Sequence, residues 1–137
     1  MKDTLIPGLG VTRRFEISRE STIDVLGEDR RVYATPAMVR DIEIACLGMI
    51  AEHLDEGEAT VGMRVEVDHL GASLEGSWVE VTGTIAEIEG RRIALDVEVR
   101  DPVDVVGKGR HVRFVIDLAR QAERVDAKRA QLAGQGR

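Results

Sequence analysis

The sequence predicts an α+β fold in which an antiparallel sheet wraps around one long helix. One helical segment runs from Thr35 to about Leu54, and its stretch from Ile42 to Ala51 is apolar except for Glu43. The chain after it alternates between apolar and polar residues with the period of two that is typical of strands. The expected strands are 11–17, 59–69, 78–89, 92–100 and 105–118. Such a sheet can bury its apolar face only against the one long helix, and this arrangement is the hot-dog architecture.

The segment before the helix begins with a weakly alternating strand at 11–17, followed by a short strand or turn at 21–26 and a polar loop at 27–31. Residues 32–34 then lead into the helix. Thr35 is expected as its N-cap and Pro36 as its first helical residue, where the missing N–H of proline costs nothing. The helix should end before 55–57, which contains Asp, Glu and Gly.

The strands after the helix form hairpins and leave one face of the sheet exposed to water. A tight turn at Gly90 joins 78–89 to 92–100, where the alternation is cleanest. In the last strand, Val112 and Phe114 place His111 and Arg113 on the opposite face, at the surface or at an interface. The tail 119–137 is predicted to be a short charged helix that frays over 134–136. Sheet edges of this kind usually pair between two copies, so a homodimer is expected.

Composition limits the possible classes of protein. A chain of 137 residues is long enough for one domain, 1–137, with its own core. The net charge of −6 argues against a nucleic-acid partner, although the pairs Arg13-Arg14, Arg30-Arg31 and Arg91-Arg92 remain candidates for touching an anionic ligand. Cys46 is the single cysteine, so there is no internal disulfide, and with no leader or membrane span in the sequence we expect a cytoplasmic protein without a membrane partner.

Two ionisable residues lie on surfaces that otherwise look buried. Glu43 is the one carboxylate in the apolar part of the helix, and a buried carboxylate needs a partner or a function. In the strand 59–69, the period of two puts His69 on the same face as Met63, Val65 and Val67. We therefore predict that Glu43 and His69 face one pocket, where a carboxylate and an imidazole can move protons.

The other candidate groups have simpler explanations. Buried packing explains Cys46 better than a nucleophilic role with His69, because free cysteine is among the most buried residue types. His53, His69 and His111 lack the spacing of metal ligands, so no metal is expected. The hydroxyl of Thr35 can cap the helix and also lie beside N–H groups that stabilise an oxyanion.

Several segments resemble the hot-dog thioesterases related to fluoroacetyl-CoA thioesterase, over residues 15–118. They are VYAT at 32–35, DIEIAC at 41–46, Gly62, VDHL at 67–70 and GRHVR at 109–113. The resemblance implies hydrolysis of an acyl-CoA thioester without metal or bound cofactor, at a site where two subunits meet. It implies a catalytic group of Thr35, Glu43 and His69, with Gly62 positioning the thioester carbonyl or the water and Arg113 near the site.

One departure from this family bears on the substrate. The loop 26–33 is short and nearly free of aromatic residues, whereas the fluoroacetyl-specific enzymes carry a longer segment with an aromatic lid. The expected substrate is therefore another short or small acyl-CoA. Two alternatives stay open: a hot-dog hydratase or dehydratase of enoyl or hydroxyacyl thioesters, and a non-catalytic domain that binds or senses acyl-CoA.

Overall fold

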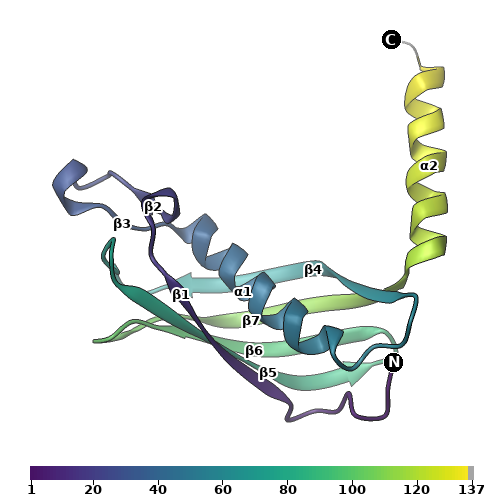
Figure 1. Ribbon diagram of the computed structural model, residues 1–137, viewed down its shortest axis with the longest axis horizontal. Helices are drawn as coiled ribbons and strands as arrows, with labels where there is room; N and C mark the ends of the chain where they lie inside the picture. Colours follow the sequence, from purple (N-terminus) through teal and green to yellow (C-terminus); the bar gives the residue numbers. More distant parts are fainter. Residues whose placement is uncertain (136–137) are drawn as a thin grey trace.

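A five-stranded antiparallel sheet curves around one helix in the computed structural model, which describes residues 1–135 (Figure 1). The strand order is β1-β5-β6-β7-β4. The strands are β1 (Gly10–Glu16), β4 (Glu58–His69), β5 (Trp78–Glu89), β6 (Arg92–Arg100) and β7 (Val105–Asp117). The predicted hot-dog architecture is confirmed, and β5 and β6 have the bounds that the alternation predicts.

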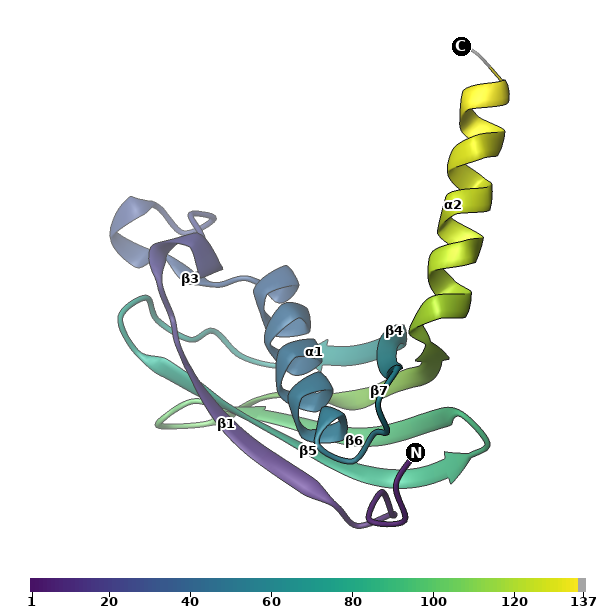
Figure 2. The ribbon, with the colours of Figure 1, turned by 45° about the vertical axis from the view of Figure 1, so that its right-hand side comes forward.

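The central helix α1 (Thr35–Ala51) lies across the concave face of this sheet (Figure 2). Its buried side recurs at helical spacing and includes Met38, Ile42, Cys46 and Ile50, none of them accessible to solvent. These side chains pack in one core with apolar residues of the inner sheet face, including Val81, Leu95 and Val99. Burial of apolar surface on this scale is the main source of stability for a fold of this size.

The start of α1 differs from the prediction. Ala34 occupies the N-cap position without a side-chain hydrogen bond, and Thr35 is already the first helical residue. Pro36 is therefore the second helical residue, which is equally tolerated because its N–H would have no partner inside the helix. The prediction of Thr35 as N-cap was wrong, and its hydroxyl is free to make a tertiary contact.

A small two-stranded sheet precedes the helix. It pairs β2 (Thr22–Ile23) with β3 (Val32–Tyr33). One short 3₁₀ turn, Arg19–Ser21, precedes β2, and another, Glu28–Arg30, lies in the connection between the two strands. The segment that was expected to be a plain polar loop thus contains a turn of helix. The side chain of Tyr33 is buried and its hydroxyl donates to Oδ2 of Asp41 at 2.6 Å, which ties this small sheet to α1.

Strand β4 lies at one edge of the sheet and contains a β-bulge. Gly62 pairs with Arg113 and Arg64 pairs with Val112, so Met63 is an extra residue in the ladder. The single apolar face that was predicted for this strand is correct only after the bulge, because Val67 packs on the core whereas Met63 is 60% exposed. The bulge lets Gly62 and His69 both face α1.

The C-terminal helix α2 (Leu118–Gly134) extends away from the body of the protein (Figure 1). Asp117 caps it by accepting a hydrogen bond from the backbone N–H of Arg120 at 3.0 Å, and none of its residues is buried. The prediction of a charged terminal helix agrees with this, although position 136 of the predicted frayed end lies outside the described residues. No helix in the described part of the chain is long and apolar enough to cross a membrane.

Candidate active site

Polar side chains gather at two points along the seam between α1 and β4. The first cluster joins Thr35, in the first turn of α1, to His69, at the end of β4. Oγ1 of Thr35 and Nδ1 of His69 share a hydrogen bond of 2.7 Å. The ring of Tyr33 stands edge-on to the imidazole, with 6.1 Å between the ring centroids. Burial lowers the pKa of His69, partly offset by a backbone hydrogen bond at Gly71, and this favours the neutral imidazole.

The second cluster is built around Glu43 and Arg113. Nη1 of Arg113 donates to Oε2 of Glu43 at 3.4 Å. The side chain of Arg113 is buried, with 3% of it exposed, whereas 41% of the Glu43 side chain is exposed. The carboxylate is thus held by a buried cation on one side and open to solvent on the other.

Gly62 provides the space for this carboxylate. A Cβ at position 62 would overlap Oε2 of Glu43 and lie 3.3 Å from its Cδ and 3.5 Å from Nη1 of Arg113. The main chain of β4 therefore touches the carboxylate directly, which only a residue without a side chain permits.

Arg113 is fixed by a set of hydrogen bonds inside the sheet. Its Nε donates to Oγ1 of Thr60 at 2.9 Å, and Nη2 donates to the carbonyl of Thr60 at 3.0 Å. Its Nη1 also reaches Nε2 of His111 at 3.2 Å. With these partners the guanidinium has one orientation, and the second N–H group of Nη1 points at Glu43. Burial lowers the pKa of Arg113, an effect that the Glu43 carboxylate opposes.

The location of His111 and Arg113 corrects the sequence prediction. They were expected on the surface or at an interface, but they are 0% and 2% exposed and face α1. The alternation was read correctly, because Phe114 lies on the outer face and is 38% exposed. The error was to assign the polar set to water. Thr60 and His111 were missed as site residues, and an Arg and a His at alternate positions of a strand were the signal for them.

The hydrogen bonds of His111 determine its tautomer. Its Nδ1 lies 2.9 Å from the carbonyl of Arg64, which can only accept, so Nδ1 carries the proton and Nε2 accepts from Arg113. Burial lowers the pKa of His111, and the positive charge of Arg113 lowers it further. A neutral His111 thus links the bulge in β4 to the cation that holds Glu43.

This link predicts a pH-dependent stability. The pKa of His111 is lower in the folded chain than in the unfolded chain. When the pH falls below about 6.5, the unfolded chain therefore binds a proton at His111 that the folded chain does not bind. The free energy of unfolding should therefore decrease as the pH falls, until His111 titrates in the folded chain. We expect His111→Gln, which can keep both hydrogen bonds without titrating, to lose less stability than the natural chain between pH 7 and pH 5 in urea unfolding. Equal losses of unfolding free energy in the two proteins would contradict a lowered pKa of His111 in the folded chain.

A groove of about 380 Å³ opens in front of Glu43. It is lined mainly by the exposed side of α1, and its wall residues are Pro36, Val39, Arg40, Glu43, Ile44, Leu47 and Arg113. His69 is not among them, so the prediction of one pocket shared by Glu43 and His69 is not met within a single chain. The two clusters lie on the same seam, and the eight residue steps from Thr35 to Glu43 separate them by roughly 12 Å along the axis of α1.

Cys46 takes no part in this groove. Its side chain is 0% exposed, and burial raises the pKa of its thiol to about 11. A neutral buried thiol is a poor nucleophile, which agrees with the packing role expected from the sequence.

Comparison with known proteins gives a consistent result. The model of the family described as fluoroacetyl-CoA-specific thioesterase matches residues 17–119. Fluoroacetyl-CoA thioesterase from Streptantibioticus cattleyicolor is 34% identical over 135 residues, which cover 93% of this chain and 97% of that protein. The solved structure of a thioesterase superfamily member from Thermus thermophilus has a TM-score of 0.88 at 27% identity, covering 96% of this chain and 98% of its own. A mutant of fluoroacetyl-CoA-specific thioesterase, solved in complex with fluoroacetate and CoA, has a TM-score of 0.77 at 33% identity and covers 85% and 98% of the two chains.

The fold and these similarities define the class of protein: it is a hot-dog thioesterase, an enzyme that hydrolyses thioesters. Within this class, the chain belongs to the fluoroacetyl-CoA-specific thioesterase family, because the family model matches most of its length and the relative is similar from end to end.

Proposed function

We propose that this thioesterase hydrolyses a short or small acyl-CoA, with Glu43 as the group that attacks the thioester or activates water for the attack. The observation that carries the proposal is the position of the Glu43 carboxylate. It lies at the wall of an apolar groove, is held from behind by the buried Arg113, and contacts the backbone of Gly62. A carboxylate that a buried cation holds at the wall of an apolar groove suits both a general base and a nucleophile.

Gly62 and Arg113 are proposed to act on the thioester carbonyl that lies beside this carboxylate. The missing side chain at Gly62 lets the Glu43 carboxylate lie against the main chain of β4, beside which the thioester carbonyl or a water molecule would be positioned. The guanidinium of Arg113 faces the same point from inside the sheet, where a buried cation favours the negative charge that develops on the carbonyl oxygen.

Thr35 and His69 are proposed to handle the proton that the departing thiolate needs. Their hydrogen bond fixes the imidazole, and the neutral imidazole that burial favours can exchange a proton with the leaving group or with water. No metal or bound cofactor enters this proposal, which uses only side chains of the protein and water.

A homodimer is proposed to bring the two clusters together. Strand β4 leaves one edge unpaired within the described residues, and exposed apolar side chains surround it. They are Ile44, Leu47, Val61, Met63 and Leu70. Antiparallel pairing of two β4 strands reverses their directions, so His69 of one protomer moves toward the Glu43 end of the seam in its partner. Sedimentation equilibrium of the full chain should give twice the mass of one chain.

The loop before α1 is the reason to propose a substrate other than fluoroacetyl-CoA. Between Asp24 and Arg31 the chain contains no aromatic side chain, and Val25 and Leu26 are 73% and 55% exposed. A panel of acyl-CoA esters with a thiol-reporting dye tests the proposal, and we expect the highest kcat/KM with a small unfluorinated acyl group. A preference for fluoroacetyl-CoA would contradict it.

The two alternatives are separated in the same assay. With crotonyl-CoA, a hydratase would remove the enoyl absorbance without releasing thiol. A non-catalytic binding domain would show thermal stabilisation by acyl-CoA but no turnover. Release of thiol from a saturated acyl-CoA supports hydrolysis, which agrees with the family of the chain.

The contact between Thr35 and His69 predicts a non-additive pair of mutations. Thr35→Val should lower kcat by up to about tenfold, the scale of one lost hydrogen bond. Because the hydroxyl acts through the imidazole, the double variant Thr35→Val, His69→Ala should be no slower than His69→Ala alone. Multiplicative losses in kcat would show that the two side chains act independently.

A further inference from the structure

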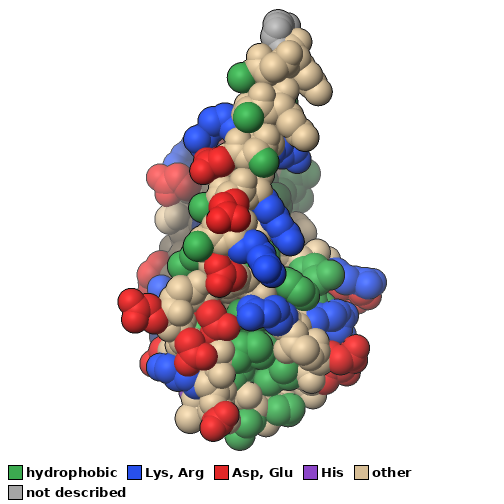
Figure 3. All heavy atoms as spheres, turned by 90° about the vertical axis from the view of Figure 1, so that its right-hand side faces the viewer, with side chains coloured by type: hydrophobic (Ala, Val, Ile, Leu, Met, Phe, Trp, Pro, Cys, Tyr) green, Lys and Arg blue, Asp and Glu red, His purple; other side chains and the backbone are tan. Residues whose placement is uncertain are grey.

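A second groove lies at the base of α2, on the side of the molecule that Figure 3 shows. Its volume is about 530 Å³. Three arginines line it: Arg120 and Arg124 from the first turns of α2, and Arg91 from the turn between β5 and β6. Phe114 of β7 lines it as well and is 38% exposed. The groove thus combines cationic side chains with one accessible aromatic ring.

The charge of the chain is distributed unevenly, and the excess of cations is on α2. Up to Asp117 the sequence has 14 Lys and Arg against 23 Asp and Glu, whereas α2 has four against two. Arg120 and Arg124 are one helical turn apart, where like charges repel, and Lys128 continues their row. Neither Arg120 nor Arg124 forms an ion pair with any residue in 1–135. Asp117 and Glu123 also line the groove, so its three guanidinium groups exceed its carboxylates by one.

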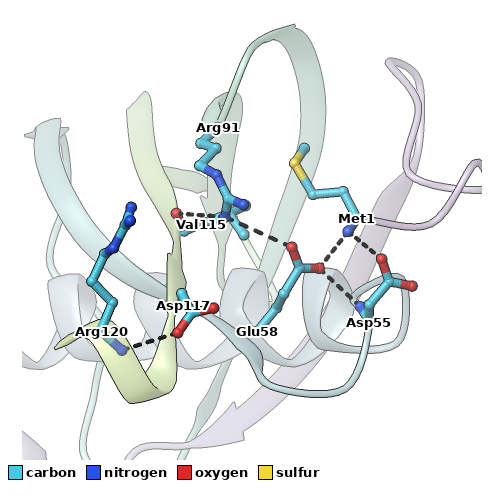
Figure 4. A network of polar contacts seen from close by, with 7 residues as sticks. All are labelled: Met1, Asp55, Glu58, Arg91, Val115, Asp117 and Arg120. Atoms are coloured by element: carbon cyan, nitrogen blue, oxygen red, sulfur yellow. Dashed lines mark hydrogen bonds and ion pairs between the residues drawn. The ribbon is translucent and has the colours of Figure 1, made fainter. Parts of the chain in front are cut away.

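Arg91 is oriented at the edge of this groove by its neighbours. Its Nη1 donates to the carbonyl of Val115 at 3.4 Å and lies 3.7 Å from Oε2 of Glu58 (Figure 4). Glu58 is shared, because its other oxygen binds the amino group of Met1. The guanidinium of Arg91 is 49% exposed in spite of these contacts, so it can still meet an anion in the groove.

A smaller hollow lies between the groove of Glu43 and the groove at the base of α2. Leu47 lines the groove of Glu43 and also a smaller hollow of about 160 Å³ between the end of α1 and the start of β4. Glu58 lines that smaller hollow and pairs with Arg91 of the α2 groove. Along β7, the four residue steps from Arg113 to Asp117 span roughly 13 Å. This distance suits a substrate with a long arm between its thioester and its charged end.

We propose that the arginine groove at the base of α2 binds the phosphate groups of CoA, with Phe114 stacking on the adenine. The inference rests on the proposed function and adds the site for the nucleotide end of the substrate. A protein with a net charge of −6 needs a local positive site to hold a ligand with three phosphate groups. Guanidinium groups match phosphate oxygens in charge and geometry, and an exposed aromatic ring offers a stacking surface to a base.

The test compares two substrates that differ only in the nucleotide: an acyl-CoA and the acyl-pantetheine with the same acyl group. For the double variant Arg120→Ala, Arg124→Ala, we expect the KM for acyl-CoA to rise at least about tenfold, the scale of one lost charged hydrogen bond. The kcat for acyl-CoA and both constants for acyl-pantetheine should stay within about twofold of the natural enzyme, because the thioester end is untouched.

Arg129→Ala is the matched control. It removes the same charge from the same helix, but Arg129 follows Arg120 by nine residues, about two and a half turns, and so lies on the opposite face, where it pairs with Asp126 at 3.3 Å. Arg124→Ala should raise the KM for acyl-CoA, and Arg129→Ala should not. An unchanged KM for acyl-CoA in the double variant, or equal rises for both substrates, would overturn the proposal.

Binding of CoA itself separates this inference from the proposed catalysis. Isothermal titration calorimetry of CoA with the full chain needs no turnover, so it tests the groove even if acyl-CoA is not hydrolysed. We expect the double variant to bind CoA at least about tenfold more weakly than the natural chain. Equal affinity of the natural chain and the double variant for CoA would overturn the assignment of the groove. If the natural chain binds CoA more tightly than the double variant but hydrolyses no acyl-CoA, only the catalytic proposal is overturned.

Discussion

Replacing Glu43 with alanine should reduce the kcat of thioester hydrolysis by a factor of at least about 100, the scale of a general acid–base contribution. The carboxylate is the one anion at the wall of the apolar groove, and the buried Arg113 holds it there. Thiol release from a saturated acyl-CoA under saturating conditions measures the effect. Glu43→Gln keeps the size of the side chain and should lose activity to a similar degree, because the charge is what the mechanism requires.

Two controls make this prediction decisive. Glu56→Ala removes an exposed carboxylate from the turn after α1 and should leave kcat within about twofold, because surface substitutions rarely have larger effects. Thermal unfolding of Glu43→Ala should show a folded protein, since the Glu43 side chain is 41% exposed. A folded Glu43→Ala with less than a tenfold loss of kcat would remove Glu43 from the mechanism.

Gly62→Ala is expected to impair catalysis by about 100-fold while leaving the protein folded. The added methyl group would overlap Oε2 of Glu43, so the carboxylate must leave its position. The carboxylate is the free end of a flexible side chain that is partly exposed, so it can move into solvent at little cost in stability. Misplacing a catalytic group by about 1 Å is enough for a loss of this size.

Kinetics and unfolding must be measured together for Gly62→Ala. We expect a fall in kcat with a melting temperature within a few degrees of the natural chain. Gly57→Ala is an informative comparison, because Gly57 has a φ of 83° and nothing near its Cβ position, so alanine there strains the backbone without touching the site. That variant should lose stability and keep kcat. An unchanged kcat in Gly62→Ala would show that the close contact between Gly62 and the Glu43 carboxylate does not contribute to catalysis.

The sequence predicted the parts of the fold that depend on local periodicity. Strands β5 and β6 agree residue for residue, because apolar residues alternate along most of each strand and a Gly turn separates them. The start of α1 was less well defined, since a Thr before a Pro is compatible with an N-cap at Thr35 or at Ala34. Only the contact with His69, which is distant in sequence, decides between them.

The site was predictable where a polar residue interrupts an apolar pattern, and less so elsewhere. Glu43 stood out because its helical neighbours are apolar. His111 and Arg113 were placed on the wrong side because polar residues in a strand are normally exposed, and the partners that make their burial possible, Thr60 and the carbonyl of Arg64, come from another strand. The roles of Gly62 and Thr35 came from the family resemblance alone.

The extra residue in β4 has a consequence for how this strand can change. Gly62 and His69 are seven positions apart, an odd number, so an uninterrupted strand would point them to opposite sides of the sheet. Met63 shifts the phase of the strand by one and makes the two residues compatible. Substitution of the Met63 side chain keeps this phase, because the extra position itself makes the bulge. Loss of the position itself would turn either the carboxylate contact or the imidazole away from α1, so the length of this strand is as much a part of the site as its side chains.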